Sequence, residues 1–299
     1  MTAFLEHEPR FIGSFDGTML AMRSLGNREL PPLLLVPSVG SNLAPWRRAL
    51  PRLLEHHHVV TWDLRGLHES GPPVTNRLDA GAHAEDAVAV MDEAGLGALP
   101  VLSWSTGGRI AVELAYRYPE RVTALMLACG MNGYPLGRLF RNLDIPVVLP
   151  LLAGAAKHFA PVCGAGLRAM AGWPELGGIV RQSGLLAPTA DIGAFVDMLK
   201  GLAECDTKAF LATYEKVAGD PAPGALEGIL APTMLVLGDK DRFTPPGLSE
   251  QIAAAIPGTE VHEYEGATHF LPLEFPARLS GDIKEFLDRL PGVTREEVP

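Results

Sequence analysis

The chain has 299 residues, 47% of them hydrophobic, which is enough to bury a large core in one α/β domain with an insertion or in two domains. Asp and Glu number 35 against 25 Lys and Arg, and like charges do not gather in blocks. The composition therefore excludes a basic surface for nucleic acid or anionic lipid and favours a small-molecule partner.

Neither a signal peptide nor a membrane span is predicted. Residues 1–8 lack the basic start and apolar run of a secretory signal, so we expect a cytoplasmic location. The longest mid-chain apolar run, 145–156, ends at Lys157 and falls short of the roughly 20 residues that a membrane-spanning helix needs. We interpret it as a helix that packs on the core or lines a pocket.

No residue spacing indicates a metal site or a cofactor. Cys129, Cys163 and Cys205 are far apart in the sequence, and we expect reduced, buried thiols. The histidine run 56–58 lacks the carboxylate or cysteine spacing of a metal ligand set. We therefore predict surface histidines there, and neither a metal nor a cofactor.

The first predicted element is an antiparallel hairpin at a sheet edge, because two β-type runs, 10–14 and 18–24, flank the turn signal Phe-Asp-Gly. The apolar run 33–36 is typical of a strand buried on both faces. The next elements in chain order are a helix at 46–55, a strand at 58–62, a helix at 78–93, a strand at 99–103, a helix at 106–118 and a strand at 124–129.

This alternation predicts a doubly wound, mostly parallel sheet with helices on both faces. It lapses after Gly130, where residues 131–226 are helical in pattern and rich in Ala, Leu, Gly and Pro. We predict that this segment is an inserted lid, and that 1–130 and 227–299 form the core. The core resumes with a strand at 233–237, a strand at 260–264 and a helix at 276–290.

The run Leu-Ser-Trp-Ser-Thr-Gly-Gly at 102–108 lies between a predicted strand and a predicted helix. A sharp strand-to-helix turn needs small residues two positions before and after an exposed nucleophile, and Ser103 and Gly107 flank Ser105 in this way. The N-terminus of the helix would stabilise negative charge that develops there. The alternative is that Ser105 only caps the helix.

A serine nucleophile needs a histidine to accept its proton and a carboxylate to orient the histidine. Later loops supply both kinds of residue in the order acid, then histidine. Asp239 and Asp241 follow the strand at 233–237, and His269 follows the strand at 260–264. A turn role for Asp241 and a structural role for His269 are the alternatives.

With these motifs the chain resembles an α/β-hydrolase fold esterase or lactonase with a helical lid, over residues 10 to about 290. The resemblance implies that Ser105 is the nucleophile, Asp241 the acid and His269 the base, with Asp239 a weaker candidate for the acid. Some relatives place the acid after the strand that follows the nucleophile helix, but residues 130–132 contain no carboxylate.

The resemblance also implies an oxyanion hole made by the backbone N–H groups of Thr106 and Val39. Three positions depart from the family pattern. Pro37-Ser38 stands where relatives usually carry His-Gly, and His68 and Ser103 each stand where glycine is common. The first departure bears on the second oxyanion donor, Val39.

A serine nucleophile favours an acyl substrate, meaning an ester, lactone, thioester or amide, because attack on an sp³ carbon would leave an ether that water does not readily cleave. We expect Ser38, Trp104 and Phe270 to contact this substrate. Apolar lid residues either line the pocket or only pack the lid on the core; they are Leu139, Phe140, Val147, Leu149, Leu151 and Phe159.

Two rival classes stay open at this point. One keeps the enzyme and changes the bond, as in a C–C hydrolase of vinylogous diketones or a cofactor-free perhydrolase, which the run Ser-Thr-Gly-Gly at 105–108 also resembles. The other is a non-enzymatic receptor that uses the pocket for ligand binding. The sequence leaves the natural substrate, stereochemical preference and oligomeric state undetermined.

Overall fold

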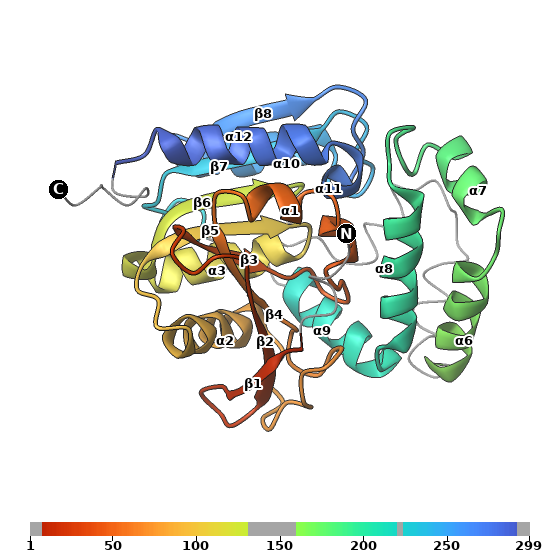
Figure 1. Cartoon of the computed structure of the whole chain (residues 1–299), viewed down its shortest axis with the longest axis horizontal. Coiled ribbons are helices and arrows are strands. Elements are labelled where there is room, and N and C mark those ends of the chain that lie inside the picture. The colour runs from red at the N-terminus through yellow and green to blue at the C-terminus, as the bar shows by residue number, and fades with distance from the viewer. Residues whose placement is uncertain (1–7, 131–159, 220–223, 292–299) are drawn as a thin grey trace.

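The computed structural model describes residues 8–130, 160–219 and 224–291. Within these residues one eight-stranded sheet has the order β1-β2-β4-β3-β5-β6-β7-β8 (Figure 1). The strands from β3 onward pair in parallel, whereas β1 and β2 form the predicted antiparallel hairpin at one edge. The bounds are β1 Arg10–Gly13, β2 Met19–Leu25, β3 Pro32–Val36, β4 His58–Trp62, β5 Leu99–Trp104, β6 Val122–Ala128, β7 Thr233–Gly238 and β8 Glu260–Tyr264.

Helices cover both faces of this sheet, as the alternation predicted. The helices α2, α3 and α10 pack on one face, and α1 and α12 on the other. Their bounds are α1 Leu50–Leu53, α2 Ala80–Glu93, α3 Gly107–Arg117, α10 Pro246–Ala255 and α12 Pro276–Asp288; the short elements are η1 Ala44–Trp46, η2 Pro119–Arg121 and α11 Leu271–Glu274.

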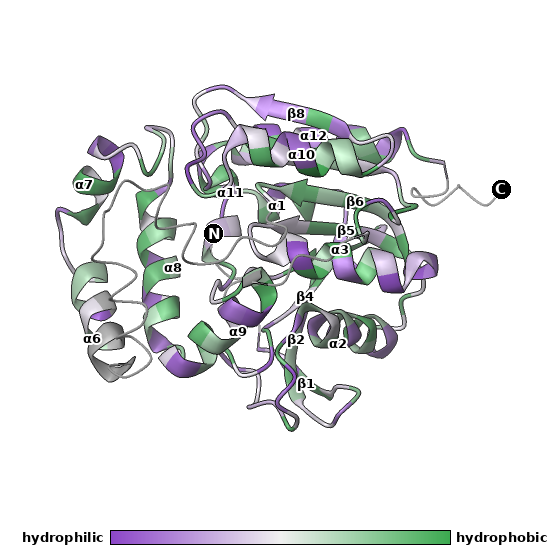
Figure 2. Ribbon diagram, turned by 180° about the vertical axis from the view of Figure 1, so that it is seen from behind, coloured by the Kyte–Doolittle hydropathy of each residue, from purple (hydrophilic) through white to green (hydrophobic). Residues whose placement is uncertain are grey.

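Alternate residues of the central strands feed two separate hydrophobic cores. Leu34 and Val36 of β3 contribute to the core under α2 and α3, whereas Leu33 and Leu35 contribute to the core under α1 and α12. This follows from the two-residue period of a strand, whose side chains point to opposite faces. Figure 2 shows that β5 and β6, at the centre of the sheet, are hydrophobic, whereas the edge strand β8 is largely hydrophilic.

Two details of the sequence prediction are wrong. The expected helix at 46–55 is instead η1 and the short α1, because Pro51 lacks the N–H that a continuous helix would need at that point. Of the three histidines expected at the surface, only His56 is exposed, whereas His57 and His58 are buried. His58 Nε2 lies 2.7 Å from Ser24 Oγ, and burial lowers the pKa of both buried rings.

Four helices lie between β6 and β7 in the sequence, within the described part of that segment. They are α6 Ala160–Ala171, α7 Leu176–Gln182, α8 Ile192–Glu204 and α9 Thr207–Gly219. Figure 1 shows α6, α7 and α8 beside the sheet. Arg47, just after η1, bonds to Asp191 at 2.9 Å and to Asp197 at 2.8 Å, which ties α8 to the core. The boundaries predicted for a lid at 131–226 stay a prediction.

No helix among the described residues is long and apolar enough to cross a membrane. The run at 145–156, which we interpreted as a packing or pocket helix, lies outside the described residues. A cytoplasmic location stays an expectation.

Candidate active site

Ser105 occupies the tight turn between β5 and α3, in the left-handed region of backbone space with a φ of 57°. A non-glycine residue is strained there and is held by its surroundings. The Ser105 N–H donates to the carbonyl of Ala128 at 3.0 Å. A Cβ on Gly107 would lie 2.8 Å from the carbonyl oxygen of Pro37, so only glycine lets α3 approach β3 this closely.

The three residues that the sequence singled out form one chain of hydrogen bonds. His269 Nε2 lies 2.7 Å from Ser105 Oγ, and His269 Nδ1 lies 2.9 Å from Asp241 Oδ2. All three side chains are buried, with Ser105 7%, Asp241 4% and His269 5% exposed. The arrangement has the geometry that a serine, its general base and an orienting carboxylate require.

Asp241, and not Asp239, faces His269. Asp241 Oδ1 accepts hydrogen bonds from the backbone N–H groups of Phe243 at 2.7 Å and Thr244 at 2.8 Å, which leaves Oδ2 for the imidazole. Asp239 instead accepts from the Gly266 N–H at 2.7 Å. Asp241 therefore also bonds to the backbone of its own turn, which was the alternative role considered for it. These bonds orient the side chain so that Oδ2 faces His269.

The loop that carries His269 is fixed by two side chains, of which sequence reasoning missed one. Trp104 Nε1 donates to the carbonyl of His269 at 2.7 Å. The buried carboxylate of Glu274 accepts from the Thr268 N–H at 2.7 Å, and its other oxygen accepts from the Ala187 N–H at 2.8 Å. Burial raises the pKa of Glu274. No motif pointed to Glu274, because its partners are distant in the sequence.

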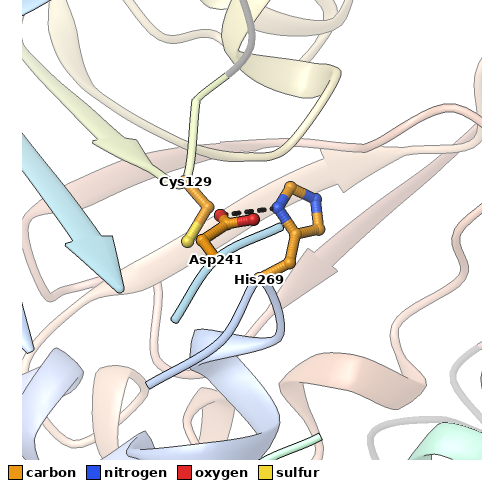
Figure 3. Close-up of side chains that lie close together, drawn as sticks. All are labelled: Cys129, Asp241 and His269. Atoms are coloured by element: carbon orange, nitrogen blue, oxygen red, sulfur yellow. Dashed lines mark hydrogen bonds and ion pairs between the residues drawn. The ribbon is translucent and has the colours of Figure 1, made fainter. Parts of the chain in front are cut away.

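Cys129, at the end of β6, lies against the same cluster (Figure 3). One donor atom each from Cys129, Asp241 and His269 lie within 4.8 Å of one another, close enough for a metal ion. Burial, and then the charge of Asp241, raise the pKa of the Cys129 thiol well above its usual range. The thiol therefore stays protonated at neutral pH, and the other two groups already bond to each other, so the cluster fits a metal poorly.

The predicted oxyanion donors lie side by side, but one of them is already bonded. The Val39 N–H donates to Thr106 Oγ1 at 2.9 Å, and Thr106 Oγ1 lies 2.8 Å from Ser38 Oγ. Ser38 thus contacts Thr106, the residue that follows Ser105. The sequence motif indicated the backbone N–H groups of Val39 and Thr106, but it did not predict the bond between Val39 and the Thr106 side chain.

A cavity of about 190 Å³ opens over Ser105. The predicted contact residues Ser38, Trp104 and Phe270 all line it. The lid residues expected there, from Leu139 to Phe159, lie outside the described residues. Further lining residues, which sequence reasoning missed, come from α8, α9 and the Asp241 loop: Met198, Leu202, Phe210, Tyr214 and Phe243.

His68 is not one of the described residues that line the Ser105 cavity. It has a φ of 49°, in the left-handed region that glycine adopts more readily than other residues. It lies against a separate, polar cavity of about 500 Å³ and within 3.5 Å of the buried Cys205 thiol. The structure describes Cys205 and Cys129 as free, buried cysteines, whereas the side chain of Cys163 lies outside the description.

Comparison with known proteins agrees with this fold. A family model described as the alpha/beta hydrolase fold matches residues 31–146. The chain is 20% identical to the enol-lactonase from Burkholderia xenovorans LB400, with a TM-score of 0.71 over 93% of this chain and 100% of that one. The bromoperoxidase from Bacillus anthracis is 16% identical, with a TM-score of 0.74 over the same shares of the two chains. The chain is therefore a protein of the α/β-hydrolase fold.

Among curated proteins, the chain is 28% identical to the pimeloyl-[acyl-carrier protein] methyl ester esterase of Neisseria meningitidis. The alignment spans 236 residues, 79% of this chain and 84% of that protein.

Gly238→Ala tests whether close backbone packing positions His269. A Cβ on Gly238 would lie 2.5 Å from the carbonyl oxygen of Ala267 and 2.6 Å from that of Thr268, so the loop must move. We expect a loss of about 1–3 kcal/mol in the free energy of unfolding from overpacking. Misplacement of His269 should lower turnover by up to about 10²-fold.

The matched control is Gly247→Ala in α10, where an added Cβ meets nothing within 4 Å. Urea unfolding and ester turnover of both variants provide the measurement. Wild-type stability and turnover in Gly238→Ala would contradict the role assigned to this contact.

Proposed function

We propose that the protein is a serine hydrolase that cleaves an ester, lactone or related acyl bond of a small, hydrophobic molecule. The observation that carries the proposal is the continuous hydrogen-bond chain from Ser105 through His269 to Asp241. The name of the Neisseria relative, a methyl ester esterase, and that of the Burkholderia enol-lactonase support acyl chemistry.

In this mechanism His269 Nε2 takes the proton of Ser105 as its Oγ attacks the acyl carbon. Asp241 holds the imidazole through Nδ1 and stabilises the positive charge that the ring acquires. His269 then donates the proton to the leaving alcohol, which leaves an acyl-enzyme. Water activated by the same histidine releases the acid and restores Ser105.

The negative oxygen of the tetrahedral intermediate is stabilised by the backbone N–H groups of Thr106 and Val39. The Val39 N–H is bonded to Thr106 Oγ1 before substrate arrives, so it becomes available when the Thr106 side chain rotates away. In its present position Thr106 Oγ1 also lies 2.8 Å from Ser38 Oγ, so the rotation exchanges both contacts of this hydroxyl. A bound oxyanion is the stronger acceptor and drives this exchange.

Perhydrolysis is the second candidate reaction, and the similarity to a solved bromoperoxidase favours keeping it. The same acyl-enzyme would then be attacked by hydrogen peroxide in place of water. No described feature favours a C–C hydrolase, and a non-enzymatic receptor would have no use for an activated Ser105. Parallel assays with ester, diketone and peroxide substrates separate these reactions.

A fluorophosphonate probe tests the nucleophile. We expect one adduct per chain, located at Ser105 by mass spectrometry, because only an activated serine attacks the phosphorus at neutral pH. The Ser105→Ala variant should take up no probe and should lose ester hydrolysis. Labelling at another residue, or equal labelling of both proteins, would defeat the assignment.

A pair of isosteric variants tests the acid. Asp241→Asn cannot stabilise the charged imidazole and should lower kcat by about 10³- to 10⁴-fold. Asp239→Asn should leave kcat nearly unchanged, because Asp239 bonds only to Gly266 and Lys240 in its loop. Steady-state kinetics with p-nitrophenyl butanoate supply the comparison, and a greater loss in Asp239→Asn would reverse the assignment.

Val39→Pro tests the second oxyanion donor, because proline has no backbone N–H. Loss of one such donor should lower kcat by about 10²- to 10³-fold. Val39→Ala retains the N–H and serves as the control for loss of the side chain. If the two variants have the same kcat and the same unfolding midpoint, Val39 is not an oxyanion donor.

A further inference from the structure

Tyr214 stands out among the residues that line the Ser105 cavity. It lies on α9, is 9% exposed and packs beside Phe210 with 6.0 Å between the ring centroids. No described residue bonds to its hydroxyl, and the hydroxyl is not one of the polar atoms that are fully buried without a partner, so it is accessible. An accessible, unpaired hydroxyl on a mostly buried ring can donate to a partner that arrives with the substrate.

The other hydroxyl groups on the cavity wall are already engaged. Ser105 bonds to His269, and Ser38 bonds to Thr106. The Ser41 hydroxyl donates to the carbonyl of Asn42 at 3.0 Å. Within the described part of the wall, Tyr214 is therefore the side-chain hydroxyl left to recognise a polar group on a ligand.

The other side chains of the cavity wall determine which chemical group of a ligand can pair with the Tyr214 hydroxyl. Met198 and Leu202 line the same cavity with apolar side chains, and no Lys or Arg is among the described residues that line it. Burial raises the pKa of Tyr214, so the hydroxyl stays a neutral donor. A neutral oxygen fits this environment, whereas a carboxylate would be buried without a counter-charge.

We propose that the substrate carries a second, neutral oxygen besides the scissile acyl group, and that this oxygen accepts a hydrogen bond from Tyr214. The inference rests on the proposed function, because it assumes that Ser105 is the nucleophile. A ketone, ether, amide or second ester supplies the required acceptor. A plain alkyl ester leaves the tyrosine hydroxyl unpaired and is therefore the poorer substrate.

Matched esters test this inference. One series contains p-nitrophenyl hexanoate and its 3-oxo, 4-oxo and 5-oxo derivatives, which place the oxygen on the acyl part. A second pair, butyl and 3-oxobutyl hexanoate followed by pH-stat titration, places it on the alcohol. Each kcat/KM is measured for wild type and Tyr214→Phe, with active sites counted by fluorophosphonate labelling.

The informative quantity is the ratio of kcat/KM in Tyr214→Phe to that in wild type, because this ratio cancels the intrinsic reactivity of each ester. We expect this ratio to be about tenfold lower for at least one oxygenated ester than for the plain ester of its series, as loss of one hydrogen bond predicts. The Tyr116→Phe variant, whose side chain is exposed, should give a ratio near one throughout.

Equal ratios for plain and oxygenated esters in Tyr214→Phe would overturn the inference. If Ser105→Ala is inactive in that case, the proposed function survives and only the substrate class is wrong. If Ser105→Ala hydrolyses the esters as well as wild type does, the proposed function fails and the inference fails with it.

Discussion

The left-handed backbone at Ser105 is the constraint on which the site depends. Such a conformation costs a non-glycine residue about 1–3 kcal/mol and persists only where neighbouring contacts hold it. Here the hydrogen bond to Ala128 and the close packing of Gly107 under Pro37 supply those contacts. The strain lifts the Ser105 hydroxyl above the carboxyl ends of the strands, where it meets His269 and the N-terminus of α3.

His269 follows β8, which is parallel to β7, β6 and β5 in the same sheet, so its loop lies at the same edge of the sheet as the loops that follow β5 and β7. Its ring is surrounded by Phe243, Trp104 and Phe270, with centroid separations between 4.9 and 5.7 Å. These rings keep water away from the bond to Asp241, and a charged hydrogen bond is stronger in such surroundings. The aromatic shell therefore supports the geometry and the electrostatics of the same bond.

Local patterns predicted the sheet and the turn at Ser105, and the resemblance to the α/β-hydrolase fold then singled out Asp241 and His269. Strand alternation and the small residues around Ser105 act over a few positions, so the sequence alone reveals them. The Glu274 carboxylate, the bond from Val39 to Thr106 and the burial of His57 depend on contacts between distant segments. Nothing in the local sequence distinguishes such a residue from a surface one, and only the folded chain brings its partners together.

The two parts of the site differ in what they control. The loops after the core strands hold Ser105, Asp241 and His269, the proposed reacting groups, whereas α8 and α9 supply Leu202 and Tyr214 to the cavity wall. Substitutions in these helices can therefore change the substrate without moving Ser105 or its partners. The net charge of −10 also restricts the substrate. It disfavours the approach of anionic molecules, and no Lys or Arg is among the described residues of the cavity wall. Neutral molecules with an apolar body and one well-placed oxygen satisfy both conditions.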